Sequence, residues 1–256
     1  MAVKELFLLP CGYLKLDQSI LTAGIGMGKI VNVPVYSALI NTDDGVVLVD
    51  TGLNPDGLTN PERAWGSRAK VVRPILTEED DIRNRLGQLG FSINDVKFVI
   101  NTHLHWDHTG GNRFFKDCPI IVQKAEYRFA LYPDSHLSSS YMENHFKHPL
   151  NYKLIEGDQE IVPGVSVITS PGHTPGHQSV IIDLPETGTV ILAGDAIYCN
   201  MNLEESIPPG NRWSASHAME SIYKLKYFRS RLGGLMLPGH EPILWSQVKS
   251  SPASYC

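Results

Sequence analysis

The fold of this 256-residue chain is constrained most by a series of short, almost uniformly apolar runs that are separated by turn residues. Runs of this length are typical of strands, and those without polar alternation must be covered on at least one face. The Thr-Asp-Asp-Gly turn at 42–45 also indicates an antiparallel hairpin. The runs predicted as strands are residues 6–9, 33–40, 46–49, 98–100, 120–122, 165–168, 180–184, 190–192 and 235–237. We therefore expect a core built from sheets.

Helical signals are fewer and alternate with the predicted strands. Thr77 and the acids at 78–80 form a helix start, and apolar residues at helical spacing follow until Gly90. Other helices are expected to begin at Ser214 or Ser216, near Lys124 and just after His108. This alternation predicts a mixed α+β and α/β architecture with helices outside layered sheets.

Three long stretches, residues 17–32, 54–74 and 132–151, show neither pattern. Loops of this length in a compact domain usually serve a function or move. None of them has the composition of an interdomain linker, and the chain has no internal repeat. Residues 1–256 are therefore expected to form a single domain.

The composition argues against nucleic acid and membranes as binding partners. The net charge is −5, and no run of lysine or arginine offers the positive stripe that nucleic acid or an anionic membrane surface would require. The four cysteines form no close pair, which fits a reducing compartment. The first residues lack the pattern of a signal peptide, and no apolar stretch reaches the roughly 18 residues of a membrane span. We expect a soluble, cytoplasmic protein.

A dense group of potential metal ligands follows the apolar run that ends at residue 100. The segment His-Leu-His-Trp-Asp-His at 103–108 carries four of them: His103, His105, Asp107 and His108. Imidazoles and a carboxylate this close would repel one another or stay half satisfied without a cation. If the extended chain continues, the first three side chains alternate onto one face, and the fourth joins them only where the backbone turns near residue 106. The spacing thus favours two metals rather than one.

Three further candidates each lie just past an apolar run, where sheet proteins tend to place functional groups. They are His173 in Pro-Gly-His-Thr-Pro-Gly-His, Asp195 in Gly-Asp, and His240 in Pro-Gly-His. His177, four residues beyond His173, is interpreted as a hydrogen-bonding or supporting residue and is left out of the ligand set.

The segment at 103–108, followed in order by the three later candidates, resembles the metallo-β-lactamase superfamily over nearly the whole chain. The resemblance implies a four-layer αββα sandwich with a dinuclear metal site between its two sheets. It also implies that His103, His105 and His173 hold one metal, that Asp107, His108 and His240 hold the other, and that Asp195 bridges them.

Within the superfamily the chain looks most like the N-acyl-homoserine lactonases, which open the lactone ring of bacterial quorum signals. The shared features are Val-Asp-Thr-Gly at 49–52, His-Thr-Pro-Gly-His-Gln-Ser at 173–179, and Tyr198 three residues after Asp195. The resemblance places Tyr198 beside the substrate carbonyl as a catalytic residue. Related lactonases are often dimers, so it also implies a homodimer. Glu241 departs from the pattern, because the best-known lactonases have Asp after the last histidine ligand.

Charge balance fits the hydrolysis of a neutral ester. Two divalent ions contribute +4, two carboxylates −2 and a bridging hydroxide −1, which leaves about +1 for a developing oxyanion. Ligands of this type without cysteine favour zinc, with iron, cobalt or manganese as alternatives. The hydroxide would attack the lactone carbonyl, Tyr198 and one metal would stabilise the oxyanion, and Asp107 would carry the proton to the leaving oxygen.

The three unassigned stretches are expected to wall an apolar channel for the N-acyl chain. The candidate wall residues are Ile20, Leu21, Met27, Ile30, Trp65, Tyr141, Met142 and Phe146. The alternative function is another hydrolase on the same scaffold, acting on an ester, a thioester or an organophosphate. A non-catalytic binder would be expected to lack one or more of the ligands, and the sequence lacks none.

Overall fold

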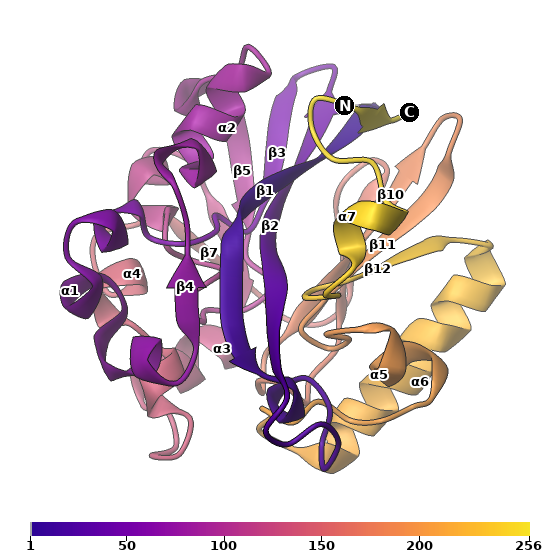
Figure 1. Ribbon diagram of the computed structural model, residues 1–256. Coiled ribbons are helices and arrows are strands. Elements are labelled where there is room, and N and C mark those ends of the chain that lie inside the picture. Colours follow the sequence, from indigo (N-terminus) through magenta and orange to yellow (C-terminus); the bar gives the residue numbers. More distant parts are fainter. Residues whose placement is uncertain (1) are drawn as a thin grey trace.

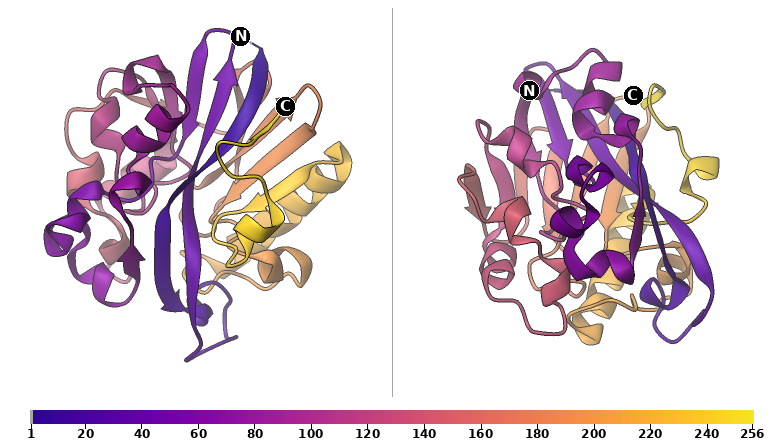
Figure 2. Two further views of the ribbon diagram at one scale, coloured as in Figure 1. Left: turned by 45° about the horizontal axis from the view of Figure 1, so that its top comes forward. Right: turned by 60° about the vertical axis from the view of Figure 1, so that its left-hand side comes forward.

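The computed structural model describes residues 2–256 and contains two β-sheets that face each other, with helices on their outer sides (Figure 1). Two further views show the same order of layers (Figure 2). This arrangement confirms the four-layer αββα sandwich of the metallo-β-lactamase fold. No helix within residues 2–256 combines the length and the apolar character that crossing a membrane would need.

The first sheet contains eight strands. They are β1 (Val3–Asp17), β2 (Ile30–Thr42), β3 (Gly45–Val49), β4 (Arg73–Ile75), β5 (Val96–Ile100), β6 (Ile120–Gln123), β7 (Tyr152–Ile155) and β13 (Ser254–Tyr255). Their order is β13-β1-β2-β3-β5-β6-β7, with β4 paired to β1 outside this path. The predicted hairpin is present, because Thr42 pairs with Gly45 where β2 turns into antiparallel β3.

The second sheet contains five strands in the order β12-β11-β10-β9-β8. They are β8 (Gln159–Val162), β9 (Val165–Thr169), β10 (Gln178–Leu184), β11 (Gly188–Gly194) and β12 (Leu235–Pro238). All nine runs predicted as strands lie in strands of the two sheets. The strands that the sequence did not reveal are β4, β7, β8 and β13, which are short and carry exposed or polar positions.

The helices fall into two sets by their place in the chain. The α-helices are α1 (Pro61–Trp65), α2 (Ile82–Gln88), α3 (Lys124–Leu131), α4 (Glu143–Phe146), α5 (Asn200–Glu204), α6 (Ala215–Leu232) and α7 (Leu244–Gln247). Short 3-10 helices occupy Gln18–Ile20, Pro55–Leu58, Gly66–Lys70, Glu78–Asp80, Ile93–Asp95, Asn112–Phe115 and Ser138–Ser140. Helices α1 to α4 lie on the side of the first sheet, and α5 and α6 on the side of the second (Figure 1).

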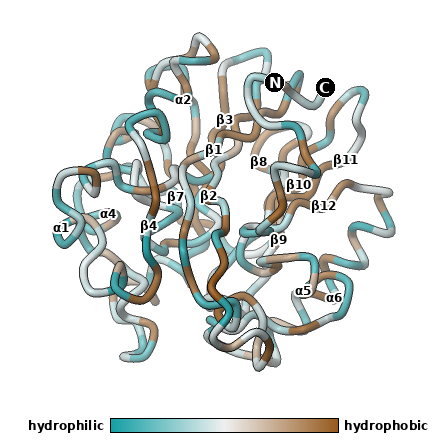
Figure 3. The backbone as a smooth tube through the Cα atoms, in the orientation of Figure 1, coloured by the Kyte–Doolittle hydropathy of each residue, from teal (hydrophilic) through white to brown (hydrophobic). Residues whose placement is uncertain are grey.

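The central strands are buried on both faces, which explains why their sequences show no polar alternation. In β1, Leu6 and Leu8 belong to the apolar cluster between the two sheets. Phe7 and Leu9, on the other face, belong to the cluster that contains residues of α2. The apolar residues accordingly concentrate along the strands at the centre of the molecule (Figure 3). Burial on both sides holds the strand ends, and hence the loops that follow them, in fixed positions.

Three of the four predicted helix starts are confirmed. Ser214 caps α6 by accepting a hydrogen bond from the His217 amide, and Gly233 ends that helix in the left-handed conformation. Helix α3 begins at Lys124. The capped segment at 77–80 forms a 3-10 turn, and α2 follows it directly.

The helix expected just after His108 is wrong. The chain forms only a 3-10 helix at Asn112–Phe115. Gly110 and Gly111 are poor helix formers, and they pack against another loop instead. A Cβ atom on Gly110 would lie 2.1 Å from the backbone nitrogen of Asn54, so this position admits no side chain. The close approach of the two loops therefore replaces the predicted helix.

Candidate metal centre

The candidate ligands lie in loops that follow four strands. The segment 103–108 follows β5, His173 follows β9, Asp195 follows β11 and His240 follows β12. β5 belongs to the first sheet and the other three strands belong to the second. The site thus lies where loops of both sheets meet, and the sandwich brings together residues up to 137 positions apart in the sequence (240 − 103).

The segment 103–108 does not continue the strand, so the expected alternation of side chains is not what gathers them. β5 ends at Ile100, and the chain turns at residues 106–108. The amide of His108 donates a hydrogen bond to the carbonyl of His105 across this turn, at 3.1 Å. The turn that the sequence required near residue 106 is present, and it brings His108 toward the other candidates.

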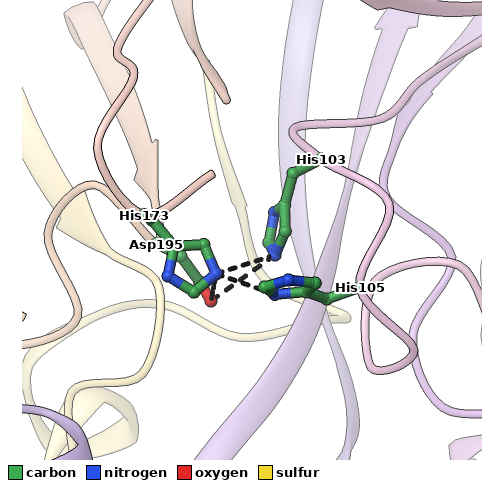
Figure 4. Close-up of side chains that lie close together, drawn as sticks. All are labelled: His103, His105, His173 and Asp195. Carbon is green, nitrogen blue, oxygen red and sulfur yellow. Dashed lines mark hydrogen bonds and ion pairs between the residues drawn. The ribbon is translucent and has the colours of Figure 1, made fainter. Parts of the chain in front are cut away.

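The first ligand group consists of His103, His105, His173 and Asp195 (Figure 4). The Nε2 atom of His173 lies 3.2 Å from Nε2 of His103 and 2.8 Å from Nδ1 of His105. Oδ2 of Asp195 lies 3.2 Å from Nε2 of His173 and 3.6 Å from Nε2 of His103. Three ring nitrogens and one carboxylate oxygen therefore point at a common centre.

The second ligand group consists of Asp107, His108 and His240. Oδ2 of Asp107 lies 3.8 Å from Nε2 of His108 and 3.6 Å from Nε2 of His240. The other carboxylate oxygen of Asp195, Oδ1, lies 3.3 Å from each of the same two nitrogens. Asp195 thus presents one oxygen to each group, which is the geometry of a shared ligand.

The hydrogen bonding of these atoms is incomplete in a way that fits bound metal. The buried atoms Nε2 of His108, Nε2 of His240 and Oδ1 of Asp195 have no hydrogen-bond partner. Buried polar atoms are rarely left unpaired, because each costs about 1–3 kcal/mol. Divalent cations placed between the nitrogens and carboxylates would satisfy these atoms and separate groups that otherwise face one another. The two clusters therefore fit a pair of metal ions.

The two groups differ in the charge that their surroundings favour. Burial, reinforced by neighbouring imidazoles, holds the pKa of His103 and His105 well below the usual range, and burial also lowers the pKa of His173. Burial opposes protonation of His108 and His240 as well, but the nearby carboxylates, above all Asp195, raise the pKa of both residues. Metal ligation requires neutral imidazoles, which the first group already favours.

The outer ring nitrogens of four of these histidines are held by oxygen atoms. Nδ1 of His103 lies 3.0 Å from the Thr102 hydroxyl, and Nδ1 of His108 lies 2.8 Å from Oδ2 of Asp50. Nδ1 of His173 lies 3.0 Å from the carbonyl oxygen of residue 211, and Nδ1 of His240 lies 2.7 Å from that of residue 34. Such contacts fix the tautomer and the orientation of the ring, as is usual around metal-binding histidines.

His177 belongs to neither ligand group. Its Nε2 atom accepts a hydrogen bond from the backbone amide of Asp195 at 3.0 Å, and its Nδ1 atom lies 2.9 Å from the Ser170 hydroxyl. Both ring nitrogens are thus satisfied by the protein. Glu241, which departs from the lactonase pattern, accepts a hydrogen bond from the Asn200 amide at the start of α5.

Tyr198 lines the cavity that opens onto the ligands. Its hydroxyl lies 3.2 Å from Nδ1 of His173, and its ring lies against that of His240, with 5.5 Å between the ring centroids. Burial raises the pKa of this phenol well above its usual value, so the hydroxyl remains a hydrogen-bond donor. The cavity is lined by Leu14, Leu16, Ile20, Leu21, Arg68, Val72, His105, Trp106, Asp107, Ser140, Asp195, Tyr198, Asn211 and His240.

Only part of the expected apolar wall lines this cavity. Ile20 and Leu21 do, together with strand residues that were not candidates. Met27 and Ile30 are exposed at the surface. The remaining candidates, Trp65, Tyr141, Met142 and Phe146, pack in the apolar clusters around the first sheet instead. Their loops therefore support the walls of the cavity more than they form its lining.

Three residues near the site were not singled out as functional by the sequence. Asp50 supports His108 and also accepts hydrogen bonds from the amide and the hydroxyl of Thr102. Arg68 lines the cavity, and Glu126 bonds to the loops that carry the ligands. Asp50 lies within the Val-Asp-Thr-Gly segment already noted. Arg68 and Glu126 are single residues in ordinary surroundings, and no spacing pattern could have identified them.

Comparisons with known proteins agree with this geometry. Residues 30–240 match the model of the metallo-beta-lactamase superfamily. An N-acyl homoserine lactonase of Bacillus thuringiensis is 38% identical over 246 residues, and the match covers 94% of each chain. The N-acyl homoserine lactonase AttM of Rhizobium johnstonii is 33% identical over 258 residues, covering 98% of each chain. A solved N-acyl homoserine lactone hydrolase, with the product N-hexanoyl-L-homoserine bound at its catalytic metal centre, is 37% identical with a TM-score of 0.91 over 100% of both chains.

Proposed function

Because the chain belongs to the metallo-beta-lactamase superfamily and, within it, to the N-acyl homoserine lactonases, we propose that it opens the lactone ring of N-acyl-homoserine lactones by metal-dependent hydrolysis. The first ligand group would hold one divalent ion, the second group another, and Asp195 would bridge them. We assign residues 1–256 to one hydrolase domain. Histidine and carboxylate ligands without cysteine favour zinc at both positions.

The shared carboxylate of Asp195 is the observation that carries this proposal. Its Oδ2 atom faces the first group at 3.2 and 3.6 Å, and its Oδ1 atom faces the second at 3.3 Å. When bound, a pair of divalent ions held by these residues would acidify a water molecule and polarise a carbonyl group at neutral pH. That chemistry suits an ester without a good leaving group, such as a lactone.

The polar residues of the cavity have separate roles in the proposed reaction. Tyr198 donates a hydrogen bond to the carbonyl oxygen, and this bond strengthens as negative charge develops there. Asp107 lies at the edge of the second group and also lines the cavity, so its carboxylate can take a proton from the attacking water and deliver it to the ring oxygen that leaves. The product is the ring-opened N-acyl-homoserine.

The rest of the cavity suits the two ends of such a substrate. Leu14, Leu16 and Leu21 supply an apolar wall for the N-acyl chain. Ring opening creates a carboxylate, and Arg68 is the cation that lines the same cavity. The Nε atom of Arg68 is buried without a hydrogen-bond partner, and within residues 2–256 no carboxylate forms an ion pair with this side chain. Arg68 is therefore available to bind the anionic product.

Ring opening releases a proton, so a pH-based assay tests the function directly. We expect higher kcat/KM for homoserine lactones with a medium or long N-acyl chain than for unsubstituted lactones, because each buried methylene contributes about 0.8 kcal/mol. Equal values for acylated and bare lactones would indicate a general esterase. Faster turnover of a phosphotriester would indicate an organophosphate hydrolase and would overturn the proposal.

A further inference from the structure

A buried carboxylate that is not among the ligands lies beside the first group. Glu126 stands in the first turn of α3, and its side chain is fully buried. A carboxylate is rarely buried without a cation or several hydrogen-bond donors around it. Glu126 has no cationic partner within residues 2–256, so its contacts must come from neutral donors.

These donors belong to the loops that carry the ligands. Oε1 of Glu126 accepts a hydrogen bond from the amide of Leu104 at 2.9 Å, and Leu104 stands between His103 and His105. Oε2 accepts a hydrogen bond from the amide of Gly176, three residues past His173, at 3.3 Å. One loop follows a strand of the first sheet and the other follows a strand of the second. A single carboxylate thus joins the two sheets at the first ligand group.

A third hydrogen-bond donor, Tyr141, connects Glu126 to the imidazole ring of His105. The hydroxyl of Tyr141 donates a hydrogen bond to Oε1 of Glu126 at 3.1 Å. The ring of Tyr141 packs edge-on against the imidazole of His105, with 4.6 Å between the centroids. Burial raises the pKa of the Glu126 carboxyl, and the surrounding hydroxyl and amide donors, first Thr174 and then Leu104, Tyr141 and Gly176, oppose that rise.

The close packing of α3 against the His173 loop depends on a glycine. A Cβ atom on Gly176 would lie 2.0 Å from the backbone nitrogen of Glu126, so a side chain there would push the loop away. The glycine therefore allows its own amide to reach the carboxylate. The missing side chain of Gly176 and the carboxylate of Glu126 are thus both needed for this contact.

We propose that Glu126 is a positioning residue that sets the geometry, and hence the metal affinity, of the first ligand group. It fixes His103 and His105 through the amide between them, His105 also through Tyr141, and His173 through its loop. The second group has no contact with this carboxylate. The proposal uses the metal sites assigned under the proposed function, but it does not depend on which substrate the enzyme accepts.

The test compares Glu126→Gln with Asp81→Asn, each of which replaces a buried carboxylate by an amide of the same shape. Asp81 caps α2 and pairs with Arg83, so these contacts lie within its own segment of the chain. In Glu126→Gln the remaining oxygen can accept from only one side, so the new NH2 group would face the N–H of Gly176 or that of Leu104 and push that loop away. Zinc affinity is measured by competition with a chelator, together with the thermal unfolding of the metal-free proteins.

We expect Glu126→Gln to weaken one of two zinc sites by about 10- to 100-fold, the usual effect of losing a residue that orients ligands, and to leave the other unchanged. Asp81→Asn should lower the unfolding temperature without changing either affinity. In a His240→Ala background, which disables the second group, Glu126→Gln should weaken the remaining site. In a His105→Ala background it should have no effect on the remaining site.

Wild-type affinity at both sites of Glu126→Gln, with reduced stability alone, would show that Glu126 only supports the fold, and would overturn the proposal. Equal weakening of both sites would overturn it as well. Should Glu126→Gln not fold, Tyr141→Phe and Glu126→Asp carry the test: a smaller loss confined to one site supports the proposal, and unchanged affinity in both contradicts it. A wild-type protein that binds two zinc ions but opens no lactone contradicts the proposed function and leaves this inference standing.

Discussion

The two ligand groups of the metal centre are held by different kinds of contact. The histidines of the first group contact neutral partners: the Thr102 hydroxyl, a backbone carbonyl and a tyrosine ring. In the second group, His108 is held by the carboxylate of Asp50 at 2.8 Å. Asp195 faces both groups, through one carboxylate oxygen to each.

This difference shows in the charge that each group favours before metal binds. The first group favours neutral imidazoles, whereas carboxylates raise the pKa of His108 and His240. The groups thus differ in their supporting contacts, but two links join them. Asp195 faces both groups, and Asp50 holds His108 directly and reaches His103 through the Thr102 hydroxyl. Substitutions should accordingly affect one site, the other, or both, according to the contacts they remove.

Among the substitutions, the largest loss of metal affinity and activity is expected at Asp195, which faces both groups. Asp195→Ala removes an oxygen from each group and leaves the histidines facing one another, so both metal sites should weaken. We expect kcat/KM for a homoserine lactone to fall by more than about 100-fold, the upper end for residues that only support ligands. Metal analysis and the lactone assay check this. His177→Gln is the matched control, and a larger loss there than at Asp195 would show that the ligand was assigned to the wrong residue.

The next largest effect should fall mainly on the second group. Asp50→Asn keeps the shape of the side chain and removes the charge that faces His108. Asp50 has a φ of 57°, and asparagine tolerates this left-handed conformation, so the fold should persist. We expect about a 10- to 100-fold loss of affinity at the second site, and a smaller loss at the first, which Asp50 reaches only through Thr102. Equal weakening of both sites in chelator competition would mean that Asp50 does not act mainly on the second group.

A third substitution should change catalysis without changing either group. Tyr198→Phe removes the hydroxyl and keeps the packing of the ring. Loss of one oxyanion donor costs up to about 100- to 1,000-fold, but a metal shares the charge here, so we expect kcat to fall about 5- to 100-fold. Metal content should equal that of the wild type. Wild-type kcat in this variant would show that Tyr198 only packs, and metal loss would show that its hydroxyl supports His173.

The smallest change, in product inhibition, is expected from a substitution of Arg68 in the cavity wall. Arg68→Met keeps an unbranched, flexible stem but removes the cation available to the anionic product. A partly exposed ion pair contributes up to about 1 kcal/mol, so product inhibition by N-acyl-homoserine should weaken about fivefold or less. The initial rate with the neutral lactone should change little. An inhibition constant that does not change would exclude Arg68 from product binding.

The sequence predicted the parts of this molecule that depend on local order. Runs such as 46–49 and 190–192 are strands with both faces buried, and the density of potential ligands at 103–108 indicated a metal site without any tertiary information. The helix expected after His108 failed because Gly110 packs against a loop more than 50 residues earlier (110 − 54 = 56), which no local pattern records.

The roles of the supporting residues could not be predicted from sequence patterns, for the same reason. Asp50 contacts a ligand 58 positions away, and Glu126 contacts the Gly176 amide 50 positions away. Asp50 lies in the Val-Asp-Thr-Gly segment, which the resemblance marked without giving the residue a role, and Glu126 lies in no such motif. Their roles follow from the way the two sheets bring their loops together, and only the folded structure shows it.

The dependence of lactone opening on metal tests the central claim most directly. The protein is stripped by chelation, its residual metal is verified by mass spectrometry, and ring opening of N-hexanoyl-homoserine lactone is followed before and after zinc is restored. We expect about two metal ions per chain in the active protein, loss of activity on removal, and recovery when two equivalents return. Full activity in a verified metal-free preparation would contradict the account.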